Sequence, residues 1–195
     1  MRWSGLHSTC CEIPVISWAA FAKRIRVPLG FAFAVVYFWL ARPRPWSLAV
    51  GILIATLGLL VRAIASGYVR KNEILTTAGP YSYVRNPLYL GSVVTAAGFA
   101  LAAQNLWIAL ALTAIFVLVY LPVIRSEETF LRKRFPEFEA YARHVPRLWP
   151  RRASLLGATG TFSWQLYCHH REYNALLGAL VMIAALAAKM VWWPK

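Results

Sequence analysis

Aspartate is absent from this 195-residue chain, and seven glutamates are its only acidic side chains, against 21 lysines and arginines. Charged residues make up only 14% of the sequence, while 59% of it is hydrophobic. A soluble domain of this length would expose far more charge. Several apolar runs also reach the roughly 20 residues that cross a bilayer. The shortage of charge therefore excludes a soluble protein and indicates an integral membrane protein.

Cysteine and metal-binding patterns are scarce as well. Cys10, Cys11 and Cys168 form no disulfide framework. His169 and His170 follow Cys168, but a metal site needs further ligands at a regular spacing, which the sequence does not offer. We therefore expect no metal site. The chain also lacks a DNA-binding motif, so its formal net charge of +14 is not interpreted as a sign of nucleic-acid binding.

The apolar runs predict an all-α membrane helical bundle with about five transmembrane helices. A short apolar segment, residues 13–22, precedes a basic cluster and is expected to lie at the membrane interface. Pro28 would open the first span, and the turn at Arg42–Pro45 would end it because proline cannot continue a helix. The predicted spans cover residues 27–41, 46–65, 88–103, 106–124 and 173–193.

Two features predict how the spans pack. Gly51, Ala55 and Gly58 form one stripe along the second span, and small residues at that spacing let two membrane helices approach closely. Gln104 and Asn105 make a tight turn between the third and fourth spans. These two spans are therefore expected to form a helical hairpin at the core of a single membrane domain.

Positive charge collects on one side of the membrane if the five spans alternate. That side receives Arg2, the cluster at 23–26, the loop 66–87 and the segment 125–171, while Arg42, Arg44 and Lys195 fall on the other. The positive-inside rule then places the N-terminus and both charged loops in the cytoplasm. The sequence shows no signal or transit peptide, which favours a prokaryotic inner membrane.

The segment GPYSYVRNPLYLG, residues 79–91, leads into the third span. It has unusually many polar side chains for a segment that enters the membrane. Tyr81 and Arg85 are four residues apart and would share one face of a short helical turn. Pro87 starts the next helix, which makes Asn86 the expected N-cap. Free N–H groups at this helix start predict a polar pocket at the membrane surface. The alternative is an interfacial loop whose tyrosines form an aromatic belt and whose arginine meets lipid phosphate.

A second polar stretch begins directly after the fourth span, where Glu127 and Glu128 would need partners as ionised carboxylates. One hypothesis is that a carboxylate faces a cationic or hydroxyl-rich ligand. The alternatives are a stabilised helix N-terminus or an i,i+4 pair with Arg132. We expect the fourth helix to continue through 125–134, which would leave no N-terminus there. The other basic residues are expected on a lipid-facing or solvated surface: Arg132, Lys133, Arg134, Arg143, Arg147, Arg151 and Arg152.

Residues 79–91 and the later stretch EETFLRKRFPEFEAYARHVPRLWP, residues 127–150, together resemble the isoprenylcysteine carboxyl methyltransferase and phospholipid methyltransferase superfamily. The resemblance implies that S-adenosylmethionine binds between the core helices and the cytoplasmic loops. It assigns a catalytic core to residues 66–152 of one domain, residues 1–195. The cofactor-binding positions that it implies are Glu73, Ile74, Leu75, Thr76, Tyr81, Asn86, Pro87, Leu88, Tyr89, Glu127 and Glu128.

Two positions depart from the family pattern. Family members often carry Arg-His-Pro where this chain has Arg85, Asn86 and Pro87, and an asparagine cannot be protonated. The arginine that meets a carboxylate substrate in the family has no match at Val123, and Arg125 is the nearest substitute. The catalytic residues implied by the resemblance are Arg85, Arg125 and Tyr81.

The implied activity is methyl transfer from S-adenosylmethionine to a lipophilic small molecule or lipidated substrate that enters from the bilayer. A prenylcysteine-type carboxylate is the favoured acceptor. Transfer from a sulfonium needs a positioned, desolvated nucleophile more than an acid or a base. No G-x-G-x-x-G follows a strand, which excludes a soluble Rossmann-type methyltransferase.

Two other functions stay open. A membrane reductase of the sterol-reductase type resembles the same helical core but binds NADPH, which would need more clustered arginines. A non-catalytic membrane protein could also retain the fold without turnover. Membrane lipids are expected partners in each case, and a homo-oligomer is left open.

Overall fold

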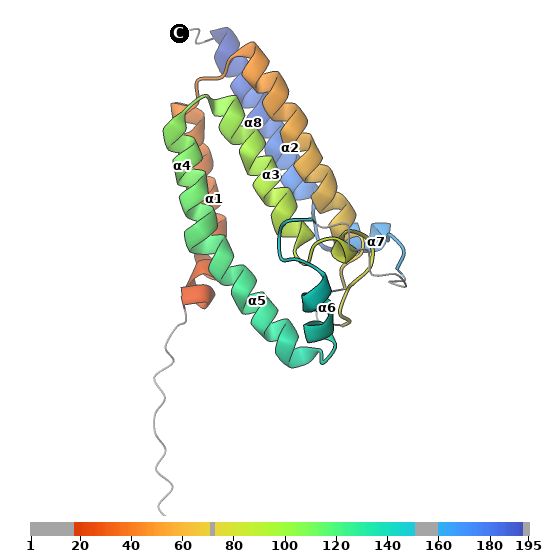
Figure 1. Ribbon diagram of the computed structural model, residues 1–195. Coiled ribbons are helices and arrows are strands. Elements are labelled where there is room, and N and C mark those ends of the chain that lie inside the picture. Colours follow the sequence, from red (N-terminus) through yellow and green to blue (C-terminus); the bar gives the residue numbers. More distant parts are fainter. Residues whose placement is uncertain (1–17, 71–72, 151–159, 193–195) are drawn as a thin grey trace, which may run out of the picture.

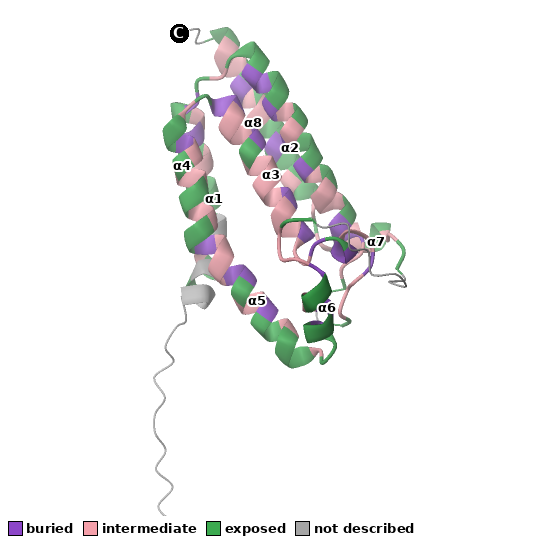
Figure 2. Ribbon diagram, in the orientation of Figure 1, coloured by how far each residue is buried: buried purple, intermediate pink, exposed green. Residues whose placement is uncertain are grey.

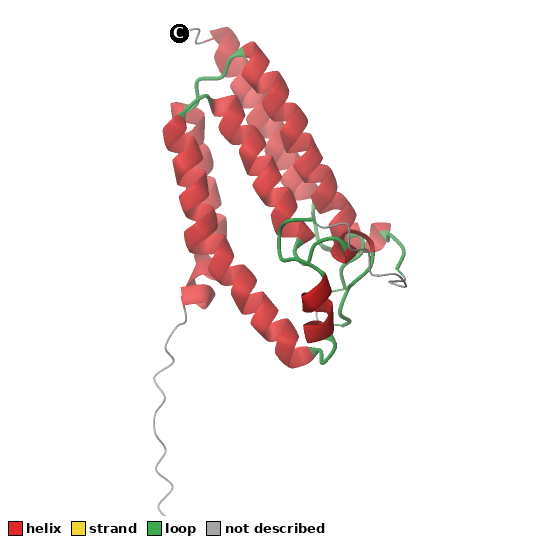
Figure 3. Cartoon of the chain, viewed as in Figure 1, coloured by secondary structure: helices red, strands yellow, loops and turns green. Residues whose placement is uncertain are grey.

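The computed structural model describes residues 18–70, 73–150 and 160–192. Within these ranges every regular element is helical, which confirms the predicted all-α bundle (Figures 1 and 3). The elements, with 3-10 and π segments written η, are α1 (Trp18–Leu40), α2 (Pro45–Ser66), η1 (Gly79–Ser82), α3 (Pro87–Ala103), α4 (Leu106–Ile115), η2 (Phe116–Tyr120), α5 (Leu121–Arg134), α6 (Phe138–His144), α7 (Trp164–His169) and α8 (Tyr173–Trp192).

Three of these helical stretches are long and apolar enough to cross a bilayer: Pro45–Ser66, Leu106–Arg134 and Tyr173–Trp192. Two of the five predicted spans are shorter apolar helices, Pro28–Leu40 and Pro87–Ala103. At a rise of about 1.5 Å per residue, 17 residues of α3 extend roughly 25 Å, slightly less than the hydrocarbon core of a typical bilayer. Large apolar side chains lie exposed along the outer helix faces, as expected for a protein surrounded by lipid (Figure 2).

The start of the first membrane helix differs from the prediction. Pro28 was expected to open the helix, but α1 begins at Trp18 and runs through this proline. Proline removes one backbone hydrogen bond and kinks a helix without having to end it. The interfacial segment expected at 13–22 is therefore, from Trp18 onwards, the first part of α1, and residues 13–17 lie outside the described residues.

The fourth span continues beyond the apolar run, as predicted. Helix runs without a break from Leu106 to Arg134, and η2 forms a π turn inside it. Pro122 directly follows this turn, at the start of α5. A proline in a helix interior removes a donor and crowds the carbonyl four residues earlier, and the wider π turn accommodates this locally.

The closest helix packing in the bundle is between α2 and α3, and glycines make it possible. A Cβ added to Gly51 would lie 2.6 Å from the carbonyl oxygen of Gly98, and one added to Gly98 would lie 2.6 Å from that of Gly51. Gly58 and Gly91 stand in the same reciprocal relation, also at 2.6 Å. The predicted close approach along the stripe of small residues is confirmed, and α3 supplies matching glycines.

The predicted turn between α3 and α4 is present, with Gln104 in the left-handed conformation at φ 48°. The Asn105 side chain accepts a hydrogen bond from the Trp107 amide and caps α4. The two helices pack less extensively against each other than α3 packs on α2. The hairpin is therefore open along part of its length, and cavities described below lie along it.

The two ends of the bundle have different characters. At the end with the α3–α4 turn, Lys189 of α8 donates to the carbonyls of Phe38, Trp39 and Ala41 at 2.6–3.0 Å, which satisfies the free carbonyls at the end of α1. The described residues between α2 and α3, together with α6 and α7, lie at the opposite end, which we call the motif end (Figure 1). Most described basic residues of the charged loops are at the motif end.

The glycine packing leads to a pair of substitutions with opposite expected signs. Gly58→Ala should lower the free energy of unfolding by ~1–3 kcal/mol because its Cβ would overlap the Gly91 carbonyl. Gly178→Ala in α8 should raise the free energy of unfolding by about 0.5–1 kcal/mol, because no atom lies within 4 Å of the added Cβ. Unfolding by SDS titration in mixed micelles measures both; equal effects would show that α2 and α3 do not pack this closely.

Candidate active site at the motif end

Two chain segments far apart in sequence are joined at the motif end. The Arg85 amide donates to the Pro146 carbonyl at 2.9 Å. The buried Tyr141 hydroxyl donates to the Tyr81 carbonyl at 2.7 Å. These bonds fasten the loop before α3 to α6 and the residues after it. The two motifs that carry the resemblance therefore form one structural unit.

The centre of this unit is the carboxylate of Glu128, which is only 4% exposed. Arg147 donates to it from Nη2 at 2.7 Å and from Nε at 3.0 and 3.1 Å. The Asn86 amide donates to Oε1 at 3.1 Å, and Arg85 Nη1 lies 3.7 Å from the same oxygen. A carboxylate buried this deeply needs such partners because desolvation strongly disfavours an unpaired charge. We call Arg85, Asn86, Glu128 and Arg147 the Glu128 cluster.

The Glu128 cluster has more donors than acceptors. Two guanidinium groups face one carboxylate, which leaves a formal surplus of one positive charge. The hydrogen bonds to Glu128 raise the pKa of Arg147 above its usual value. The Arg85 Nε is buried and has no hydrogen-bond partner in the part of the chain that the structure describes. The cluster can therefore accept a further anionic or carbonyl group.

Asn86 occupies the predicted N-cap position of α3, but its side chain does not cap the helix. The amide instead donates to Glu128 and, at 3.3 Å, to the Arg147 carbonyl. The buried carboxylate competes successfully because a hydrogen bond to an ionised group is stronger than a neutral cap. Within the described chain no side chain caps the first turn of α3. Its N-terminus remains available to attract a negative group.

Glu127 differs from its neighbour in having no ion pair or hydrogen bond to another described side chain. It is partly exposed, on the α5 turn beside the Glu128 cluster. The sequence could not distinguish the roles of the two adjacent glutamates. In the structure, Glu128 is committed to protein partners and Glu127 is available for a ligand.

Tyr81 and Tyr141 are both buried, and burial is the main cause that raises the pKa of each phenol above its usual value. Both groups are therefore neutral at physiological pH. A tyrosinate at either position would not serve as a general base under these conditions.

The remaining predicted site residues are distributed around this unit. Glu73 and Ile74 are exposed, while Leu75 packs against the buried cluster of Phe138, Tyr141 and Val145. Arg125 is exposed, and the structure does not bring it to the Glu128 cluster. The others lie on or next to the unit. The Thr76 hydroxyl accepts a hydrogen bond from the Arg70 amide, and Pro87 is buried at the start of α3, where Leu88 follows it. The Tyr89 ring meets the Tyr120 ring at a centroid distance of 6.0 Å.

Two residues of the unit were missed by sequence reasoning. Arg147 was assigned to a lipid-facing or solvated surface, but it is the main partner of Glu128. The alternative pair of Glu128 with Arg132 is wrong too, since Arg132 pairs with Glu139 of α6. Tyr141 was not considered at all. The spacing of Phe138, Tyr141 and Val145 was a usable signal for Tyr141, because it indicates three apolar side chains on one side of a short helical segment. It does not indicate which arginine after that segment reaches Glu128.

Two apolar cavities lie deeper in the bundle. The α4 cavity, of about 840 Å³, lies between α3 and the α4–η2 stretch and includes Tyr120, the residue that packs on Tyr89 of the first motif. The α8 cavity, of about 490 Å³, lies between α1, α3 and α8. Ser92 and Phe33 line both cavities. An apolar space thus extends from the membrane-facing helices to the edge of the motif end.

Removal of one cluster arginine tests whether the buried carboxylate depends on it. Arg147→Gln should lower the free energy of unfolding by about 1.5–3 kcal/mol, because the buried carboxylate of Glu128 loses its charge-assisted bonds to the half-buried Arg147. Arg132→Gln removes an exposed pair with Glu139 and should change it by less than ~1 kcal/mol. If SDS titration finds the same effect for both variants, Glu128 is not a buried centre.

The Tyr141 hydroxyl gives a pH-dependent test. Tyr141→Phe should cost about 1–3 kcal/mol near neutral pH because the buried Tyr81 carbonyl loses its donor. The folded state keeps the phenol neutral, so its stabilising effect is fully present below the unfolded pKa of about 10 and declines above it. The difference between native and variant should therefore shrink as the pH rises past 10 in thermal unfolding scans. A constant difference would contradict the buried, neutral phenol.

Comparison with known proteins gives the chain a family. Residues 29–137, more than half of the chain, match the phospholipid methyltransferase family. The cobalt-zinc-cadmium resistance protein CzcN of Cupriavidus metallidurans is 36% identical over 156 residues, 76% of this chain and 71% of that protein. The nickel-cobalt-cadmium resistance protein NccN of Alcaligenes xylosoxydans xylosoxydans is 38% identical over 154 residues, 75% and 72% of the two chains. No solved structure matches.

The relatives' names concern metal resistance. Among the described residues, no group of three or more His, Cys, Asp or Glu side chains is placed to hold a metal ion. The family match, residues 29–137, includes Arg85, Asn86 and Glu128, three of the four residues of the Glu128 cluster. The resemblance seen in the two motifs is confirmed, and this membrane protein belongs to the phospholipid methyltransferase family.

Proposed function

We propose that this protein transfers a methyl group from S-adenosylmethionine to a lipophilic acceptor at the motif end of the bundle. The observation that carries the proposal is the position of the Glu128 cluster. It joins both family motifs around one buried carboxylate, and the apolar α4 cavity extends to Tyr120, whose ring meets Tyr89 of the first motif. A polar cofactor and an apolar acceptor would meet at this boundary.

The residues present suit the chemical groups of S-adenosylmethionine. Its carboxylate would be attracted by the surplus positive charge of the cluster, the unpartnered Arg85 Nε and the uncapped start of α3. Its amino group or ribose hydroxyls would donate to Glu127, the carboxylate without another described partner. Donors and acceptors of the right kind are therefore concentrated at the start of α3, in the residues just before it, and on α5.

When bound, the cofactor supplies an electrophilic methyl group on a sulfonium. The acceptor's nucleophilic atom forms the new bond to this carbon while the carbon–sulfur electron pair returns to sulfur. A carboxylate acceptor loses no proton in this step, so it needs no general base, in keeping with the neutral Tyr81 and Tyr141. The protein's part is to exclude water and to align the two reactants.

The acceptor and the orientation belong to the proposal as well. The names of the relatives concern metal resistance and specify no methyl acceptor. The apolar lining of the α4 cavity favours a lipidic or lipid-attached acceptor, such as a prenylcysteine-type carboxylate. We place the motif end on the cytoplasmic side, where positive charge is favoured and S-adenosylmethionine is available.

Cofactor binding tests the proposal directly. S-adenosylhomocysteine should bind the purified protein in calorimetric titration, and Glu127→Gln should weaken binding by about 1.5–3 kcal/mol, roughly 10- to 150-fold in Kd, because one charge-assisted hydrogen bond is lost. Glu139→Gln, an exposed glutamate paired with Arg132, is the matched control and should leave Kd unchanged.

NADPH serves as the second ligand in the same experiment. Heat from NADPH alone would move the assignment to a membrane reductase. If neither ligand gives binding heat with the folded protein, a family member that has lost turnover would be favoured. Equal weakening by Glu127→Gln and Glu139→Gln would remove Glu127 from the site.

A further inference from the structure

Arg62 is a charged residue within a membrane-spanning helix that the proposed cofactor site does not use. It lies near the end of α2 and donates from Nε and Nη2 to Glu172 Oε2, at 3.1 and 2.7 Å. Its Nη1 donates to the hydroxyl of Ser92 on α3. Ionisable side chains within membrane helices are rare and usually mark a binding site or pathway. The surroundings of Arg62 show what it could bind.

The last glycine of the first motif makes room for this side chain. A Cβ added to Gly91 would lie 2.6 Å from Arg62 Cγ and 2.6 Å from the carbonyl oxygen of Gly58. The alkyl stem of Arg62 therefore crosses α3 at Gly91, and the guanidinium reaches Ser92 one position later. The motif thus serves a second purpose, deeper in the bundle than the Glu128 cluster.

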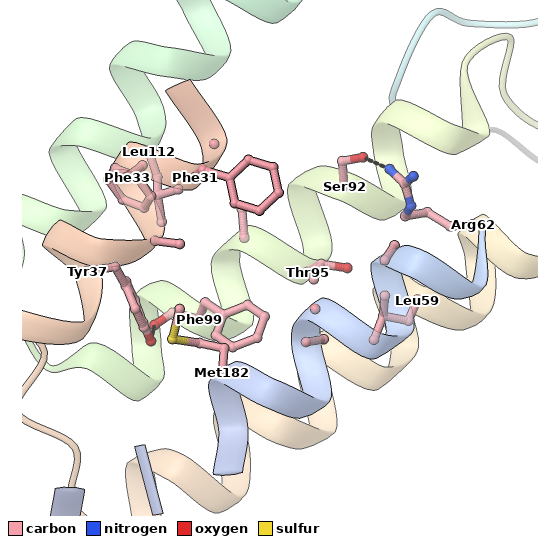
Figure 4. A pocket seen from close by; sticks show the side chains of 16 residues that line it. Phe31, Phe33, Tyr37, Leu59, Arg62, Ser92, Thr95, Phe99, Leu112 and Met182 are labelled. Carbon is pink, nitrogen blue, oxygen red and sulfur yellow. Dashed lines mark hydrogen bonds between the residues drawn. The ribbon is translucent and has the colours of Figure 1, made fainter. Parts of the chain in front are cut away.

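Arg62 and Ser92 form the polar end of the α8 cavity. Figure 4 shows them facing each other at one end of this space, with Tyr37 and Met182 towards the other. Its volume of about 490 Å³ lies in the range of small-molecule sites. Among the residues that the structure describes, Arg62 is the one charged side chain that lines it, and Glu172 is not part of its wall. Most of the remaining lining is aromatic or aliphatic: Phe31, Phe33, Tyr37, Phe99, Leu112 and Met182.

This polar end presents donors. A guanidinium has five N–H groups, and three of those of Arg62 are directed at Glu172 and Ser92, so two have no partner among the described residues. The hydroxyls of Ser92 and Thr95 donate to backbone carbonyls of α3. A positive group with free donors at one end of an apolar cavity is complementary to an anion with a hydrophobic tail.

We propose that the α8 cavity binds a single-chain amphiphilic acid, with its carboxylate at the two free N–H groups of Arg62 and its tail along the aromatic lining. The cavity is much smaller than a two-chain phospholipid, which selects a single chain. Ser92 is six residues from Asn86, about 9 Å along α3, and it lines both cavities. The acid belongs to the acceptor class of the proposed methyl transfer; that assignment rests on the proposed function, whereas binding of the acid does not.

Glu172 allows an acid-binding role of Arg62 to be distinguished from a purely structural one. This residue directly precedes α8 and competes with a ligand for Arg62, since its carboxylate receives two of the guanidinium's bonds. Removal of its charge should therefore tighten the binding of an acid. If Arg62 only held α2 and α8 together, loss of Glu172 would weaken the bundle and leave acid binding unchanged.

The test uses the full-length protein in nanodiscs without cofactor, with the fluorescent C18 carboxylate cis-parinaric acid as probe and oleic acid or oleyl alcohol as competitor. Oleic acid should displace the probe at least tenfold better than the alcohol. Glu172→Gln should raise the affinity for oleic acid several-fold. The double variant Arg62→Gln/Glu172→Gln leaves no unpaired charge and should fold but lose the preference for the acid. Arg70→Gln, an exposed arginine just beyond α2, is the matched control and should bind as the native protein does.

Several outcomes would overturn the inference: equal displacement by acid and alcohol, unchanged or weaker acid binding in folded Glu172→Gln, or a retained acid preference in the double variant. Displacement by dioleoylphosphatidylglycerol as effective as by oleic acid would assign the cavity to bulk membrane lipid instead. Preferential acid binding in a protein that does not bind S-adenosylhomocysteine would uphold the acid site and defeat only the proposed methyl transfer.

Discussion

Burial of one carboxylate organises the motif end of this protein. Glu128 is almost fully buried in a chain that has only seven acidic residues, and Arg147, Arg85 and Asn86 supply its partners. These partners come from the start of α3 and from the segment after α6, so the network holds α3, α5 and the returning chain in one arrangement. Because an unpaired charge here would be very unfavourable, none of the three segments can move independently.

The arrangement produces a boundary between two environments. Close packing of α2 on α3 through paired glycines positions the start of α3, and the looser contact between α3 and α4 leaves apolar space beside it. That space reaches Tyr120, whose ring meets Tyr89 near the start of α3. Polar groups with unused hydrogen-bonding capacity, Glu127 and Arg85 Nε, lie at the motif end beyond it. Under the proposed function, this arrangement lets a small membrane protein hold a charged cofactor and a lipid-soluble acceptor without a separate soluble domain.

Much of the fold could be predicted from the sequence because an apolar run of bilayer-spanning length satisfies its backbone hydrogen bonds in lipid by forming a helix. The bounds of α2, α3 and α8, the turn at Gln104 and the continuation of α5 followed from hydropathy and proline placement. Pro28 inside α1 and the π turn before Pro122 did not, since proline can either end a helix or be accommodated in it.

The site was harder to predict than the fold. The motifs identified Arg85, Asn86 and the glutamate pair, but the partner of Glu128 is set by a tertiary contact that no helical spacing encodes. Arg147 has the same local appearance as its basic neighbours and differs only in the path of the chain after α6. Arg62 likewise acquires a role only when Gly91 and Ser92 are placed beside it.

The central claim, that the motif end binds S-adenosylmethionine, is tested most directly by ultraviolet cross-linking of methyl-labelled S-adenosylmethionine to the purified protein, with the labelled peptides mapped by mass spectrometry. The proposed function predicts label in residues 73–89 and 121–134, removed by excess S-adenosylhomocysteine. Label that is confined to other segments, or that excess S-adenosylhomocysteine does not remove, would contradict it.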